Sequence, residues 1–214
     1  MLDVFTPQLG YDDPLPVVVY LGGISLGGDE RRQWMLSEVP RVVADRRVVF
    51  VAPQIRRGVL GFTPHPLVAE SSYPHSAGNQ GASDLYSALK WVQINIEHFG
   101  GDPTKVTLLG HQAGAALIWP MLGSPKIRGL IQGAWLTGAA IMHPRLNWRE
   151  AHPYHARPLN CSTLTCLQTV HSRTVMETSS LDWRRPYGRP WLVTDGVFVP
   201  FYSSPPQVPT VVGN

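Results

Sequence analysis

Hydrophobic residues in the first 140 positions gather into short unbroken runs, separated by stretches with helical periodicity. Runs at 16–21, 47–52 and 106–109 lack alternating polar positions, and each ends at a glycine or a proline. Such runs are typical of strands that helices cover on both faces. A fourth run, at 2–5, predicts a further strand at the start of the chain.

The longest predicted helix covers residues 83–98, where four apolar side chains recur at the spacing of one helical face: Leu85, Leu89, Val92 and Ile96. Asp84 is expected in its first turn, where the helix dipole favours a carboxylate. Residues 100–103 supply stop signals, and a second helix is predicted over 113–122. Strands that alternate with helices in this way predict an α/β protein with a largely parallel sheet.

The last third of the chain has a different pattern. Residues 141–190 are rich in Pro, His and Arg without a clean period, and strand-like runs follow at 191–194 and 209–213. The second run is either an edge strand or an interior strand that lacks its covering helix. Since both ends of the chain fall inside apparent strands, we expect residues 1–214 to be part of one larger domain, truncated at the C-terminus and also at the N-terminus.

Composition and charge exclude several classes of protein. The chain is 43% hydrophobic and 15% charged, and its net charge of +3 comes from arginines in the last third. It contains no apolar run of about 18 residues and no basic start before an apolar segment, so neither a transmembrane helix nor a signal peptide is predicted. Basic and aromatic residues form no common stripe, and nucleic-acid binding is therefore not expected. His152 and His155 are close in sequence but lack further ligands, so we predict no metal and no cofactor.

The segment after the 106–109 run has the form strand, tight turn, helix. Gly110 and Gly114 occupy the first and fifth positions of the turn, a spacing typical of a nucleophile elbow, which raises its middle side chain above the sheet. The middle residue is Gln112, whose amide nitrogen has its lone pair delocalised into the carbonyl and cannot attack an acyl carbon. We interpret His111 as a hydrogen-bonded packing residue. The turn therefore predicts a degenerate elbow without a nucleophile.

Several segments resemble the carboxylesterase/cholinesterase family of α/β-hydrolases, and together they span essentially the whole chain. The most specific are residues 78–81, Asp84, 88–93, 95–96 and 99–103, joined by residues 2–7, 17–23 and the set Arg56, Gly58, Gly61 and Phe62. The resemblance implies the N-terminal part of an α/β-hydrolase fold, with Gln112 where active members carry the nucleophile. The acidic and histidine members of the family's triad would lie beyond 209–213, outside this sequence.

The oxyanion loop of the family is also altered. Active members have Gly-Gly-Gly-Phe where this chain has Gly22, Gly23 and Ile24, followed by serine. Loss of the third glycine is expected to displace or shield the backbone N–H groups that would bind a tetrahedral oxyanion. Ala113 matches the residue after the nucleophile, and its N–H is a relic donor. We therefore expect Gln112→Ser alone not to restore ester turnover.

The serine-free elbow and the first 19 residues are similar to catalytically inactive adhesion members of the family. This resemblance implies an extracellular domain at the cell membrane that binds a secreted or cell-surface protein. Membrane anchorage would depend on segments absent from this sequence. Two alternatives stay open: a carboxylic ester hydrolase with a non-standard nucleophile, and a non-functional fragment of poor solubility.

Cys161 and Cys166 are the two cysteines of the chain. Taken alone, the pair is compatible with free thiols, a partial metal site or a small disulfide. The family resemblance implies a disulfide in this region. Asn160 opens a formal glycosylation sequon, although a bonded cysteine in its middle position disfavours modification. Both features fit an extracytoplasmic domain.

Overall fold

The computed structural model describes residues 1–10, 12–22, 30–73, 75–138, 144, 146–155, 161–179, 192–203 and 205–213. Its strands are β1 (Leu2–Phe5), β2 (Leu15–Leu21), β3 (Val49–Pro53), β4 (Gly101–His111), β5 (Gly133–Thr137) and β6 (Thr210–Gly213). Its α-helices are α1 (Glu30–Arg46), α2 (Gly58–Phe62), α3 (Pro66–Glu70), α4 (Gln80–Asn95), α5 (Ala113–Met121), α6 (Trp148–His155), α7 (Leu164–Thr169) and α8 (Ser172–Ser179), and a 3₁₀ turn, η1 (Ile96–Phe99), follows α4.

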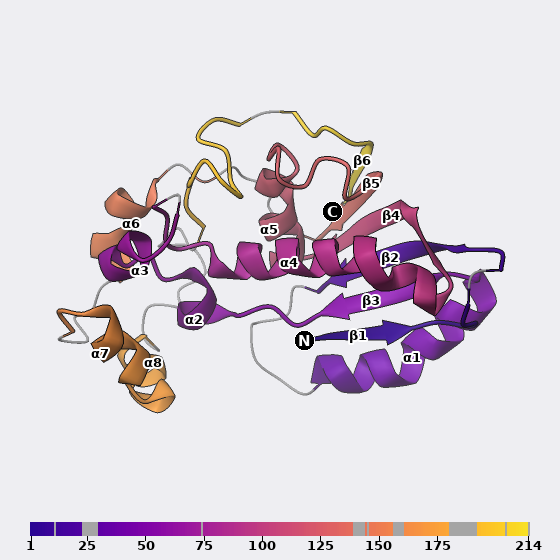
Figure 1. Cartoon of the computed structure of the whole chain (residues 1–214), viewed down its shortest axis with the longest axis horizontal. Helices are drawn as coiled ribbons and strands as arrows, with labels where there is room; N and C mark the ends of the chain where they lie inside the picture. Colours follow the sequence, from indigo (N-terminus) through magenta and orange to yellow (C-terminus); the bar gives the residue numbers. More distant parts are fainter. Residues whose placement is uncertain are drawn as a thin grey trace.

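The described strands form one sheet in the order β1-β3-β2-β4-β5-β6, with β1 and β6 at its edges. β1 is antiparallel to β3, and every other neighbouring pair is parallel. This confirms the predicted α/β architecture with its largely parallel sheet. In Figure 1, α4 crosses in front of the sheet while α7 and α8 lie away from it, beside α2.

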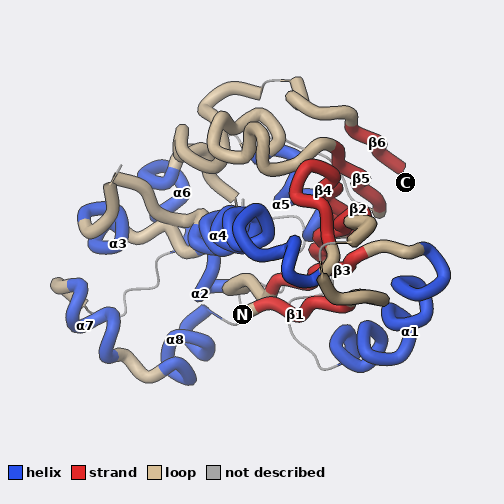
Figure 2. The backbone as a smooth tube through the Cα atoms, turned by 45° about the vertical axis from the view of Figure 1, so that its right-hand side comes forward, coloured by secondary structure: helices blue, strands red, loops and turns tan. Residues whose placement is uncertain are grey.

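The two faces of the sheet bury different side chains because neighbouring residues of a strand point to opposite sides. Val17 and Val19 of β2 belong to the large core cluster beneath α4 and α5, whereas Val18 and Tyr20 pack with the smaller cluster beneath α1. Figure 2 shows α1 on the opposite side of the sheet from α4. The predicted stripe is confirmed, because Leu85, Leu89 and Val92 of α4 and Ile96 at the start of η1 are all fully buried.

The α1 side of the sheet is covered unevenly. Among the described helices, α1 lies there beside β1 and β3 (Figure 2). Farther along the sheet, Trp135 of β5 is paired in register with Val211 of β6, and the two residues are 55% and 60% exposed. Neither strand contains a charged residue. This part of the described sheet thus presents an exposed, uncharged apolar strip.

Two predicted boundaries were wrong. The helix begins at Gln80 rather than Ser83, so Asp84 lies outside the first turn; there it pairs with Arg56 instead of facing the helix dipole. The strand predicted at 106–109 extends over Gly101–His111. Gly100, in the left-handed conformation at φ 74°, alone ends the preceding turn, and Gly101 already pairs with Leu15 of β2.

The pattern of the last third also needs correction. The run at 191–194 forms no strand among its described residues, because Thr194 makes only an isolated bridge with Asn147. Residue 191 lies outside the described residues. The run at 209–213 does form a strand, β6, as predicted, and this strand pairs with β5. Short helices, α6 to α8, occupy part of the segment in which no periodicity was visible.

Candidate functional site

Gln112 stands at a sharp turn between β4 and α5. Its backbone has φ 52° and ψ −119°, a combination that residues with a side chain rarely adopt and that costs on the order of 1–3 kcal/mol. The side chain is exposed, as expected for the middle residue of an elbow. The turn between Gly110 and Gly114 therefore has a strained backbone at its middle residue.

The flanking glycines are required by close packing. A Cβ atom on Gly110 would lie 2.8 Å from Cα of Ala115 and 2.9 Å from Cδ1 of Ile118. A Cβ atom on Gly114 would overlap the carbonyl oxygen of Leu21, at the end of β2. These two positions let α5 begin directly against the sheet. The glycine spacing that identifies the elbow thus has a steric cause that does not depend on catalysis.

The elbow is also fixed to the neighbouring strand, β5. The Gln112 backbone N–H donates to the carbonyl of Thr137 at 2.8 Å. Nδ1 of His111 lies 3.1 Å from the hydroxyl of Thr137, and the Gln112 carbonyl accepts from the Ala116 N–H at 3.0 Å. His111 is therefore a hydrogen-bonded packing residue, as predicted.

The chemistry available at this turn is limited. The Gln112 amide can donate and accept hydrogen bonds but supplies no nucleophile. Ala113 is the first residue of α5, and N–H groups in the first turn of a helix have no partner within the helix. Gly22 follows β2, whereas Gly23 and Ile24 of the predicted oxyanion loop lie outside the described residues. At the described residues of this turn, the side chain of Gln112 therefore offers hydrogen-bonding groups only.

Arg56 and Asp84 form the best-connected ion pair of the described structure. The Arg56 guanidinium donates to the Asp84 carboxylate at 2.8 and 2.9 Å, and the Arg56 backbone N–H donates at 2.8 Å. Partial burial acts to raise the pKa of Asp84, but these hydrogen bonds outweigh it and leave the pKa below its ordinary value. The hydrogen bonds that the guanidinium donates to Asp84 raise the pKa of Arg56. The pair joins the segment before α2 to α4 and has a structural role.

Asp195 is a buried carboxylate that sequence reasoning missed. Its Oδ1 accepts from the backbone N–H groups of Val197, Phe198 and Val199 at 2.9, 2.9 and 2.8 Å, and its Oδ2 accepts from the Ser76 hydroxyl at 3.3 Å. The Asp-Gly dipeptide at 195–196 could have indicated this turn from the sequence, and Gly196 indeed has a φ of 69°. The carboxylate is fully used in holding that turn.

Asn79 ties the same loop to the start of α4. Its side chain is 3% exposed, its amide nitrogen donates to the Val193 carbonyl at 2.8 Å, and its oxygen accepts from the Val193 N–H at 3.4 Å. Beside it, Oε1 of Gln80 is buried without a hydrogen-bond partner among the described residues. Residues 78–81, which carry the strongest family resemblance, therefore organise the fold around α4.

A surface hollow of about 590 Å³ lies away from the elbow. The start of β1, the end of β3 and the middle of α4 line it, with Leu2, Arg56, Asp84 and Trp91 among the lining residues. None of the five elbow residues contributes to it. The hollow therefore gives no substrate pocket at Gln112.

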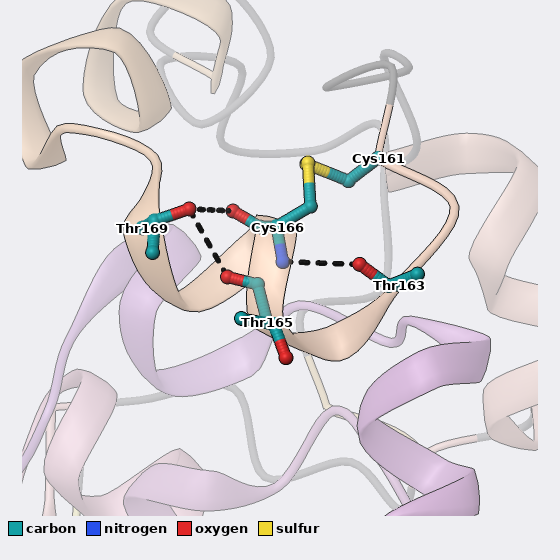
Figure 3. The surroundings of a disulfide bond; sticks show 5 residues. All are labelled: Cys161, Thr163, Thr165, Cys166 and Thr169. Atoms are coloured by element: carbon teal, nitrogen blue, oxygen red, sulfur yellow. Dashed lines mark hydrogen bonds between the residues drawn. A yellow bond between two sulfur atoms is a disulfide. The ribbon is translucent and has the colours of Figure 1, made fainter.

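Cys161 and Cys166 form a disulfide, which confirms the pairing implied by the resemblance. Cys166 lies in α7, where its N–H donates to the Thr163 hydroxyl and its carbonyl accepts from the Thr169 hydroxyl (Figure 3). The bond closes a short loop, so it constrains this helix rather than the whole chain. Asn160, the predicted glycosylation site, lies outside the described residues.

The described residues contain no group of three or more potential metal ligands. Nδ1 of His152 lies 2.8 Å from the carbonyl of Pro64, and the side chain of His155 lies outside the described part of the structure. Each helix in the described part of the chain is too short or too polar to span a bilayer.

Comparisons with known proteins place these features in a family. The profile of the Carboxylesterase family matches residues 1–213. Neurotactin of Drosophila melanogaster is 34% identical in an alignment 212 residues long, which covers 91% of this chain and 25% of neurotactin. Cocaine esterase of Homo sapiens is 30% identical over 230 residues, covering 99% of this chain and 38% of the enzyme. The chain thus spans about a quarter to two fifths of the length of these relatives.

Solved esterase structures share the fold. A thermophilic PNB esterase superposes with a TM-score of 0.74 at 26% sequence identity, over 93% of this chain and 42% of the esterase. The six-stranded sheet with helices on both faces is accordingly that of an α/β-hydrolase. This confirms the predicted fold.

Proposed function

The chain belongs to the carboxylesterase family, and from that premise we propose that it is a catalytically inactive, neurotactin-like member that acts by binding another protein. The single observation that carries the proposal is Gln112. This residue has no nucleophilic character, yet it stands at the middle of a turn with the strained backbone typical of an elbow. Loss of the nucleophile removes covalent catalysis, because the remaining groups of such a site have nothing to activate.

The proposed partner is a secreted or cell-surface protein, and the proposed location is the extracellular side of the cell membrane. The similarity to neurotactin supports both proposals. The Cys161–Cys166 disulfide adds support, because such bonds persist in oxidising compartments. The alternative is an ester hydrolase with a non-standard nucleophile, which the esterases among the relatives favour.

We expect the protein to hydrolyse a short-chain p-nitrophenyl ester no faster than the buffer does, and Gln112→Ser to leave the rate at that level. The serine would lack an oxyanion loop of the active type, since Ile24 replaces its third glycine. The rate of p-nitrophenol release measures the outcome. An active esterase of the family, assayed in parallel, is the positive control.

Two results would contradict this prediction in different ways. Turnover that is abolished by replacing one Ser or Cys would identify the protein as a hydrolase. Strong turnover by the Gln112→Ser variant alone would mean that the oxyanion loop is intact and that only the nucleophile has been lost.

Binding is tested separately from hydrolysis. A fluorescent fusion of the protein is expected to bind saturably to live cells that carry the partner, and trypsin treatment of those cells should abolish the binding because the partner is a surface protein. Gln112→Ser is expected to bind like the wild type, since it leaves the surrounding fold unchanged. Binding that survives trypsin, or absence of binding to every cell type of the source tissue, would contradict the adhesion proposal.

A further inference from the structure

His65 and His152 meet where α6 packs against the turn before α3. Their ring centroids are 5.5 Å apart and the rings are nearly perpendicular. Both side chains are partly buried. The two histidines come from segments far apart in the sequence, so their contact joins the last third of the chain to the first.

The hydrogen bonds of the pair fix its protonation pattern. Nδ1 of His65 accepts from the backbone N–H of Leu67 at 3.2 Å and caps α3, so this nitrogen must carry a lone pair. Nδ1 of His152 lies 2.8 Å from the carbonyl of Pro64, so it must carry a hydrogen, because a carbonyl only accepts. The contact as it stands therefore requires His65 to be neutral.

Protonation of His65 would break this arrangement in two ways. It would place an N–H on Nδ1, directly against the donating N–H of Leu67. It would also place a positive charge beside the imidazole ring of His152, whose centroid lies 5.5 Å from that of His65. The opposite end of α6 is held independently, since Thr194 N–H donates to the Leu146 carbonyl at 2.9 Å.

We propose that the His65–His152 pair is a pH-sensitive latch, which holds the C-terminal half of α6 against the turn before α3 and releases it under acidic conditions. The start of α6 stays attached through its bridge to Thr194. Release would therefore free the C-terminal half of α6 while its start stays in place. The device is independent of the proposed binding function.

The other charged groups near the pair do not account for the behaviour of His65. Charged or titratable side chains on the elements around the pair are Arg57 before α2, Glu70 on α3, His75 after α3, Arg149 and Glu150 on α6, and Asp195 on the loop that contacts α6. Of these, Asp195 is engaged by Ser76 and by backbone N–H groups, and Glu150 accepts from the backbone N–H of Asn147. Burial, first, and the charge of His152, second, lower the pKa of His65 below its ordinary value of 6.5.

The sign of the pH dependence follows from that direction. His65 has a lower pKa when α6 is docked than when it is released. Above the pKa of the released form, this difference does not affect docking. As pH falls below that pKa, protonation of the released form increasingly disfavours the docked state. The contribution of neutral His65 to docking should therefore be fully present about one pH unit above 6.5. It should weaken by up to about tenfold for each pH unit below that value, until the lowered pKa is reached.

Hydrogen exchange of peptides covering residues 149–155 tests the latch on the full chain, with each rate divided by the intrinsic rate at the same pH. The wild type is expected to lose up to about tenfold of its protection between pH 7.5 and 5.5, while peptides of α4 lose none. His65→Asn and His65→Ser keep an oxygen that caps α3 but do not titrate, so their protection should be independent of pH.

His171 supplies a matched control. Its Nδ1 accepts from the backbone N–H of Arg173 at 3.2 Å, the same capping contact on α8, away from His152. His171→Asn is expected to behave like the wild type at α6. The proposal is overturned if wild-type α6 keeps its protection at pH 5.5, or if the two His65 variants lose as much protection as the wild type.

Discussion

Gly114→Ala is expected to destabilise the protein by about 3 kcal/mol or more, although alanine is the better helix former. The added methyl group would overlap the Leu21 carbonyl oxygen, and neither the end of β2 nor the start of α5 can withdraw without breaking sheet or helix hydrogen bonds. Urea denaturation measures the effect. For a chain of this length the corresponding fall in Tm is about 6–12 °C.

Gly133→Ala is the matched control for this prediction. Gly133 lies in the same sheet, at the start of β5, and a Cβ atom there would sit 3.6 Å from the nearest atom, the Pro209 carbonyl oxygen. This is ordinary van der Waals contact, so we expect a change of less than about 1 kcal/mol. Equal stabilities of the two variants would mean that α5 has room to move and that the elbow glycines are not sterically required.

Asp195→Ala is expected to lower the free energy of unfolding by about 3 kcal/mol. The substitution removes the oxygen that accepts three consecutive backbone N–H groups, and the last of these belongs to Val199, which is fully buried. Buried donors without a partner are costly because water cannot replace the lost bond. The expected fall in Tm is again about 6–12 °C.

Asp195→Asn separates the hydrogen bonds from the charge. An amide oxygen accepts from the same three N–H groups, so the loss should be only about 1 kcal/mol, reflecting the weaker bonds of an uncharged acceptor. If the alanine and asparagine variants unfold at the same denaturant concentration, the turn is held by its packing rather than by the carboxylate.

The fold was largely predictable where local pattern and burial agree. The α4 stripe and the three central strands were visible because each buries its apolar positions almost completely. β5 was not predicted from the sequence. It buries Ala134 and Leu136 but exposes Trp135, so its exposed position is apolar and the alternation of polar and apolar residues typical of a half-buried strand is absent. α1 was also not predicted, because Pro40 lies in its interior and an interior proline usually indicates the end of a helix.

The candidate site was predictable only in its local part. The spacing of Gly110 and Gly114 predicts the backbone of the elbow, because both glycines belong to the same five-residue turn as Gln112. The Arg56–Asp84 pair joins positions 28 residues apart, and the cap that Asp195 provides depends on where the chain returns after α8. Such contacts follow from topology, which no local periodicity records.

The distance along the chain between β5 and β6 has a consequence for biosynthesis. Residues 138–209 separate the two strands, so at about 5–20 residues per second a ribosome needs roughly 4–14 s to deliver β6 after β5. Throughout that interval the outer edge of β5 lacks its hydrogen-bonding neighbour, and Trp135 stands beside it without a charged residue in the strand. The nascent chain is therefore exposed to mispairing at β5 after the elbow has been synthesised and before β6 emerges.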